Sequence, residues 1–134
     1  MRIVLDTNVL ISGIFFTGPP HRILETWKQG GLALLLSTPI LDEYRRVGHE
    51  LAKQYRGIDL APLFNVLTTE AEFVREITLT QQVCQDPDDD KFLACAIAGN
   101  RHVIVSGDRE LLKVSGYQDI QVLRPRIFVD TDLP

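Results

Sequence analysis

Short apolar segments alternate along this chain with longer segments that have helical patterning. The predicted strands are Arg2–Leu5, Leu32–Leu36, Phe73–Leu79, His102–Val105 and Ile120–Leu123. Strands that are apolar at nearly every position are typical of parallel sheets covered by helices on both faces. The predicted helices are His21–Gln29, Pro39–Tyr55, Leu60–Ala71 and Asp89–Ala98. This alternation predicts an α/β fold with an open, mainly parallel sheet and right-handed crossovers.

The length of 134 residues is typical of one domain with one core, so we expect a single domain over residues 1–134. No apolar run approaches the roughly 20 residues needed to cross a bilayer. An acid at position 6 interrupts the N-terminus too early for a signal peptide. We therefore expect a cytoplasmic protein without a membrane partner. The tail, Arg124–Pro134, is predicted to be a surface segment.

The cysteine content and the net charge exclude few further classes of protein. Cys84 and Cys95 match no zinc-binding spacing, and two thiols do not make a disulfide scaffold. The chain has 14 basic and 18 acidic residues, a net charge of −4. If Asp6, Glu43, Asp90 and Asp108 are left out, the remaining 14 acidic residues balance the 14 basic ones. Net charge therefore neither supports nor excludes a nucleic-acid partner.

Four acidic residues lie at the ends of predicted strands or the starts of predicted helices. Asp6 follows the first strand, and Asp108 follows the strand that ends at Val105. Glu43 lies in the first turns of one helix, and Asp90 opens another. Because the carboxyl ends of parallel strands meet at one edge of a sheet, we expect these side chains to share a crevice.

Carboxylates in one crevice repel one another unless a cation lies between them. Oxygen-only ligation selects Mg²⁺ or Mn²⁺, so the pattern predicts a metal-dependent enzyme. Each acid alone has a simpler interpretation, because helix starts and turns favour acids as caps. Asp6 fits that interpretation least, since an unpaired charge at the end of a central strand costs several kcal/mol.

Several segments together resemble the PIN-domain ribonucleases, and among them the toxin components of prokaryotic toxin–antitoxin pairs. The resemblance extends from Met1 to about Leu123. It rests on Asp6-Thr7-Asn8 after the first strand, Glu43 in an early helix, Asp86-Pro87-Asp88-Asp89-Asp90-Lys91-Phe92-Leu93 and Val105-Ser106-Gly107-Asp108.

The resemblance implies a three-layer α/β/α fold and cleavage of single-stranded RNA that depends on Mg²⁺ or Mn²⁺. It assigns Asp6, Glu43, Asp90 and Asp108 as catalytic, metal-binding residues. It assigns Asn8 and Ser106 as supporting polar residues. Asp88 or Asp89 is left as an alternative to Asp90 within the acid cluster. The partners it implies are a cognate antitoxin and a second copy of the chain in a homodimer.

Basic residues near these acids are candidates for contact with RNA phosphates. The candidates are Arg45, Arg46, Lys91, Arg101 and Arg109. Their simpler interpretation is as solvated surface charges or as partners of nearby glutamates, because exposed ion pairs contribute only about 0–1 kcal/mol.

Three alternative functions stay open at this stage. A stand-alone RNA-processing nuclease would carry the same four acids. A phosphatase with an aspartyl nucleophile is less well matched, because Asp6-Thr7-Asn8 lacks a second acid two residues on. A non-catalytic PIN-like module that binds RNA or protein is the third alternative.

Overall fold

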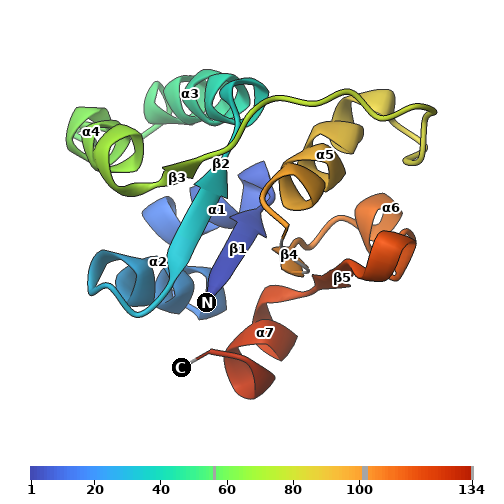
Figure 1. Cartoon of the computed structure of the whole chain (residues 1–134). Coiled ribbons are helices and arrows are strands. Elements are labelled where there is room, and N and C mark those ends of the chain that lie inside the picture. The colour runs from blue at the N-terminus through green and yellow to red at the C-terminus, as the bar shows by residue number, and fades with distance from the viewer. Residues whose placement is uncertain (56, 101–102, 134) are drawn as a thin grey trace.

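The computed structural model describes residues 1–55, 57–100 and 103–133. Its strands form one sheet in the order β3-β2-β1-β4-β5, in which every neighbouring pair is parallel (Figure 1). The strands are β1 (Arg2–Leu5), β2 (Ala33–Leu36), β3 (Glu72–Phe73), β4 (Val103–Val105) and β5 (Gln121–Leu123). The predicted α/β class and parallel sheet are confirmed. His102, the predicted first residue of the fourth strand, lies outside the described residues.

Helices of the described chain connect these strands and cover the sheet. They are α1 (Thr7–Phe15), α2 (Pro19–Lys28), α3 (Thr38–Ala52), α4 (Ala61–Glu70), α5 (Asp90–Ala98), α6 (Arg109–Leu112) and α7 (Pro125–Thr131). Short 3₁₀ segments, η1 (Pro87–Asp89) and η2 (Tyr117–Asp119), precede α5 and β5. None of the helices in the described residues is both long and apolar enough to cross a membrane.

The central strands are buried on both faces. Ile3, Val4 and Leu5 of β1 are each at most 1% exposed. Since successive strand residues point to opposite faces, burial of all three requires packing on each side of the sheet. Helix α5 packs against β1 and β4, while α1 packs against α2 and α3. The three-layer α/β/α arrangement follows from this burial.

The chain adds strands first on one side of β1 and then on the other, so a topological switch point lies between β1 and β4. From β1 the chain moves to β2 and then β3 on one side, and it returns through α5 to β4 on the other side of β1. In open α/β sheets, such a switch point leaves a crevice outside the carboxyl ends of the two strands, where ligands bind. Leu5 pairs with Val105 at this edge, so the residues that follow both strands are neighbours.

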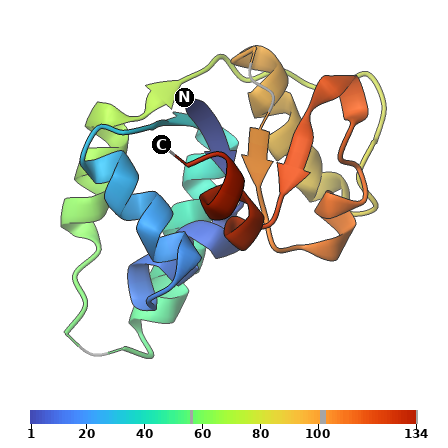
Figure 2. The ribbon, with the colours of Figure 1, turned by 90° about the horizontal axis from the view of Figure 1, so that it is seen from below.

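Two predicted elements differ from the structure. Of the strand predicted over Phe73–Leu79, only Phe73 lies in a strand, β3 (Glu72–Phe73). Its partner β2 ends at Leu36, and the chain then enters α3, so β2 offers the residues after Phe73 no further strand partner. The tail, predicted to be a surface segment, contains α7, in which Phe128 and Val129 are buried. Figure 2, seen from below, shows α7 folded back beside α2, with the two chain ends on the same side of the molecule.

Gly13 allows α1 and α2 to approach closely. A Cβ at this position would lie 2.7 Å from Leu24 Cδ1 and 2.8 Å from the carbonyl oxygen of Pro20. Alanine favours a helix by about 1 kcal/mol relative to glycine, but overpacking costs about 1–3 kcal/mol. Because the backbone oxygen cannot rotate away, we predict that Gly13→Ala lowers the free energy of unfolding in urea by about 1 kcal/mol.

Gly107→Ala is the matched control, since nothing lies within 4 Å of a Cβ there. Its free energy of unfolding should stay within about 0.5 kcal/mol of the unmodified protein. An equal or greater stability for Gly13→Ala would show that the two helices are not in tight contact at this position.

Candidate active site

A hydrogen-bonded serine joins the ends of the two central strands. Asp6 follows β1 and donates its backbone N–H to the carbonyl of Val105 at 2.9 Å. Ser106 follows β4, is fully buried, and donates its hydroxyl to Asp6 Oδ2 at 2.6 Å. The same hydroxyl accepts the backbone N–H of Asp108 at 3.0 Å. The strand-end positions therefore bring Asp6 and Asp108 to one edge of the sheet.

These residues form one side of a cavity of about 220 Å³, here called the acidic pocket. It is lined by Asp6, Thr7, Asn8, Glu43, Arg46, Val47, Asp86, Asp88, Asp89 and Asp108. Six of these ten side chains are carboxylates and one is basic. Asp6, Glu43 and Asp108 lie together as the sequence predicts, and Asn8 lies at the exposed rim.

Glu43 reaches the pocket from α3, which begins directly after β2 with a proline in its first turn. Thr7 donates its hydroxyl to Glu43 Oε2, and Lys91 donates its ammonium group to Glu43 Oε1 at 2.6 Å. Lys91 also contacts Asp88 Oδ2 at 2.8 Å. Glu43 is therefore held from α1 on one side and from α5 on the other.

The structure does not place Asp90 with the other acids. The Asp90 carboxylate accepts the backbone N–H groups of Val83 at 3.1 Å and Cys84 at 2.7 Å, and it does not line the acidic pocket. Asp89 and Asp88 line it instead. A helix turns by about 100° per residue, so adjacent acids at its start face different directions. The alternative of Asp88 or Asp89 matches the geometry.

Burial and mutual repulsion raise the pKa of two acids. Asp6 is 6% exposed, and its pKa is raised by burial and by the charges of Asp108 and Glu43, against the lowering effect of the Ser106 hydrogen bond. Burial and the charges of Asp108, Asp6, Asp86 and Glu43 raise the pKa of Asp89 to about 6. Among the described residues, the charges that act on these two carboxylates are therefore mainly negative.

The predicted phosphate contacts have different environments. Arg46 lines the pocket, with 67% of its side chain exposed, 3.9 Å from Glu43. Arg45 and Arg109 are exposed and do not line it. Lys91 is 13% exposed and paired with two acids. Arg101 lies outside the described residues.

Thr7 and Asp86 are polar pocket residues to which the sequence assigns no role. Thr7 is buried and holds Glu43, and Asp86 accepts the backbone N–H of Asp88 at 2.9 Å. Lys91 was expected to contact phosphate, but it holds Glu43. A threonine directly after a strand-end acid is a weak signal for Thr7. Nothing in the sequence indicates the pairing of Lys91, since 48 residues separate it from Glu43.

The donor chemistry of the pocket fits a hard divalent cation. Its charged donors are carboxylate oxygens, which suit Mg²⁺ and Mn²⁺. Within residues 1–55, 57–100 and 103–133, no three acidic, histidine or cysteine side chains are gathered closely enough to hold one ion directly. Mg²⁺ is commonly bound through one or two carboxylates and several waters, which needs no such cluster. The residues present therefore fit such an ion.

The fold and the pocket define an α/β protein with a carboxylate-lined crevice at the switch point of a parallel sheet. A family model described as PIN domain matches residues 2–110. The chain belongs to the PIN domain family, and the match includes every acid of the pocket.

A solved structure shares this fold. A chain in the crystal structure of VapBC2 from Rickettsia felis, bound to a DNA fragment from their promoter, matches with a TM-score of 0.61 and 14% identity. The alignment covers 92% of this chain and 98% of that chain. No curated protein matches the chain significantly.

The raised pKa of Asp89 predicts a pH-dependent stability of the metal-free protein. Folding raises this pKa from 3.8 to about 6, so the folded state binds a proton more tightly than the unfolded state. The resulting stabilisation is complete below pH 3.8 and is lost as the pH rises through about 6. We predict that Asp89→Asn raises the thermal midpoint at pH 7.5 in EDTA, and that this gain shrinks toward pH 4.

Asp130→Asn, an exposed acid on α7, is the control and should change the midpoint little at any pH. An Asp89→Asn gain that is the same at pH 7.5 and pH 4, or a loss at pH 7.5, would contradict the raised pKa.

Asp90 is predicted to stabilise the protein through the loop that it holds. Asp90→Ala leaves the backbone N–H groups of Val83 and Cys84 without their acceptor. Hydrogen bonds to charged groups contribute about 1.5–3 kcal/mol, so we expect the free energy of unfolding in urea to fall by about 2 kcal/mol. Asp130→Ala provides the comparison for loss of an exposed carboxylate. A loss of similar size in both variants would show that Asp90 does not anchor this loop.

Proposed function

We propose that this protein is an endoribonuclease that hydrolyses phosphodiester bonds of single-stranded RNA with Mg²⁺ or Mn²⁺. The observation that carries the proposal is the buried Asp6 carboxylate, which faces other acids at the switch point of a PIN domain. An anion in that position is costly unless a cation neutralises it. A cation between carboxylates in an open crevice is the arrangement that metal-dependent phosphodiester hydrolysis uses.

We assign the metal-facing carboxylates to Asp6, Asp89 and Asp108, with Glu43 beside them. Asp89 replaces Asp90 in this assignment, because the Asp90 carboxylate is occupied by two backbone N–H groups. Ser106 orients Asp6, and its contact with the Asp108 N–H fixes the spacing of the two strand ends. Asn8 is the polar side chain at the rim.

The chemistry follows from the charge of the substrate. A bound Mg²⁺ or Mn²⁺ supplies an activated water and neutralises the charge that develops on the phosphate. Asp6, Asp89 and Asp108 keep this side of the pocket anionic, so that the cation is retained. Arg46, at the edge of the pocket, is placed to contact an RNA phosphate. Attack of water on phosphorus gives products with a 5′-phosphate and a 3′-hydroxyl.

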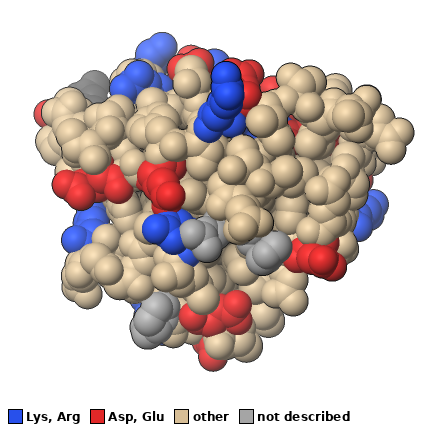
Figure 3. Space-filling model, viewed as in Figure 1, with Lys and Arg blue, Asp and Glu red and all other residues tan. Residues whose placement is uncertain are grey.

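The face shown in Figure 3 gives little support for binding long nucleic acids by charge alone. On the face shown in Figure 3, the described Lys and Arg side chains lie in separate groups among acidic ones. Extended electrostatic tracking of a phosphate backbone needs a continuous basic surface. This distribution favours recognition of a short single-stranded segment at the pocket.

We further propose that the protein is the toxin of a toxin–antitoxin pair in the cytoplasm, with a cognate antitoxin as partner and a homodimeric assembly. The similarity of the fold to a chain of the VapBC2 complex supports this assignment. A stand-alone RNA-processing nuclease would have the same pocket. A small adjacent reading frame whose product binds and inhibits this protein would favour the toxin over the stand-alone nuclease.

The direct test is cleavage of a mixed single-stranded RNA pool with Mn²⁺, with Mg²⁺ or with EDTA. We predict cleavage with either metal, none in EDTA, and at least a hundredfold slower cleavage by Asp6→Asn, since loss of a group that stabilises transition-state charge costs about 10²–10³-fold. Asp130→Asn is the matched control, with an exposed acid changed outside the pocket. Equal cleavage by Asp6→Asn and the control would show that the pocket is not the active site. RNA binding without turnover would favour a non-catalytic module.

A further inference from the structure

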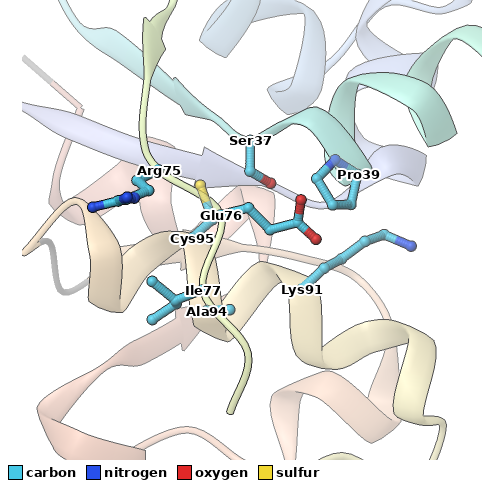
Figure 4. A pocket seen from close by; sticks show the side chains of 8 residues that line it. All are labelled: Ser37, Pro39, Arg75, Glu76, Ile77, Lys91, Ala94 and Cys95. Carbon is cyan, nitrogen blue, oxygen red and sulfur yellow. The ribbon is translucent and has the colours of Figure 1, made fainter.

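Lys91 is an internal counter-ion of the acidic pocket. Its ammonium nitrogen lies 2.6 Å from Glu43 Oε1 and 2.8 Å from Asp88 Oδ2. The Lys91 and Glu43 side chains are only 13% and 15% exposed. Figure 4 shows a small pocket of which Lys91 lines one edge, with the Lys91 ammonium group extending away from Ser37 and Cys95. The charge of Lys91 is therefore directed toward the acids.

Both carboxylate oxygens of Glu43 already accept hydrogen bonds. Oε1 accepts from Lys91, and Oε2 accepts from the buried hydroxyl of Thr7. A divalent ion ligated by Glu43 would lie close to the Lys91 ammonium group, and like charges at that distance repel strongly in a partly buried site. Glu43 is thus neutralised by the protein itself.

On the opposite side of the pocket, the described part of the chain places no such cation. Among the described residues, the Lys, Arg and His nitrogens within 4 Å of a carboxylate do not include any beside Asp6, Asp89 or Asp108. Asp6 is held by Ser106 through Oδ2, and Asp108 is held by the Glu110 N–H through Oδ1. Asp6 also accepts the backbone N–H of Thr7, and none of these contacts brings a positive charge. Among the described residues, the negative charge that no cation balances is therefore concentrated at Asp6, Asp89 and Asp108, with Asp86 beside them.

We propose that Lys91 takes the place of a cation beside Glu43 and Asp88, so that the protein binds a single divalent ion, beside Asp6, Asp89 and Asp108. Lys91 is then a positioning residue that acts through Glu43, and Glu43 is not a direct metal ligand. This inference rests on the proposed metal dependence of the site. Its consequence is a count of bound ions, which can be measured without any RNA.

The test is isothermal titration of the full chain with Mn²⁺, supported by the Mn²⁺ electron paramagnetic resonance signal. We expect one ion per chain for the unmodified protein and two for Lys91→Met, in which Glu43 and Asp88 lose their counter-ion. The double variant Glu43→Gln, Lys91→Met should bind one ion again, since the second position then lacks its main carboxylate. Lys113→Met, which breaks an exposed pair with Glu110, is the matched control and should bind one ion.

Glu43→Gln alone provides a second measurement if Lys91→Met does not fold, which circular dichroism would show. We expect it to bind one ion with a loss of affinity of about tenfold, as for a residue outside the ligand set. Asp6→Asn should show no measurable binding. Affinity lost equally in Glu43→Gln and Asp6→Asn would overturn the inference.

The remaining outcomes separate this inference from the proposed function. Two ions in the unmodified protein, or one ion in a folded Lys91→Met, would overturn the role of Lys91 and leave metal dependence intact. No ion in the unmodified protein at millimolar Mn²⁺ would instead contradict the proposed metal dependence itself.

Discussion

The carboxylate of Asp6, buried at the end of the central strand, is the constraint on which the rest of the site depends. An ionised carboxylate removed from water costs several kcal/mol, and the hydrogen bond from Ser106 offsets only about 1.5–3 kcal/mol of that cost. That bond exists because β1 and β4 pair in parallel and end together, Leu5 beside Val105. The strand order that creates the switch point therefore also creates a position where a negative charge is held without enough compensation. The proposed cation would supply further stabilisation.

The charges around this carboxylate are divided between two sides of the pocket. On one side, Glu43 and Asp88 share the ammonium group of Lys91, and hydrogen bonds from Lys91 lower the pKa of Asp88. On the other side, the pKa of Asp89 is raised by burial and by neighbouring carboxylates. One group of acids is thus neutralised within the protein, and the proposed cation would stabilise the other.

Sequence patterns predict the residues whose positions follow from regular structure. The sequence predicts that Asp6 and Asp108 lie close together, because each follows a buried parallel strand and the ends of such strands meet. Glu43 follows from an early helix together with the family resemblance. Asp89 could not be separated from Asp90, because five neighbouring residues include four acids and a step of one residue changes the direction of a side chain. The backbone N–H groups of Val83 and Cys84 bind the Asp90 carboxylate and so keep it out of the pocket. These two residues lie in a segment without regular structure. Helix α7 was missed because seven residues are too few to show a helical pattern, although Phe128 is fully buried.

Crystals of the protein grown with Mn²⁺, measured at a wavelength where manganese scatters anomalously, show directly whether the anionic side of the pocket holds a divalent cation. We expect an anomalous peak bounded by the carboxylates of Asp6, Asp89 and Asp108, with the Asp90 carboxylate still bound to the loop at Val83 and Cys84. A fully occupied peak elsewhere, or no peak in this pocket at millimolar Mn²⁺, would contradict this expectation.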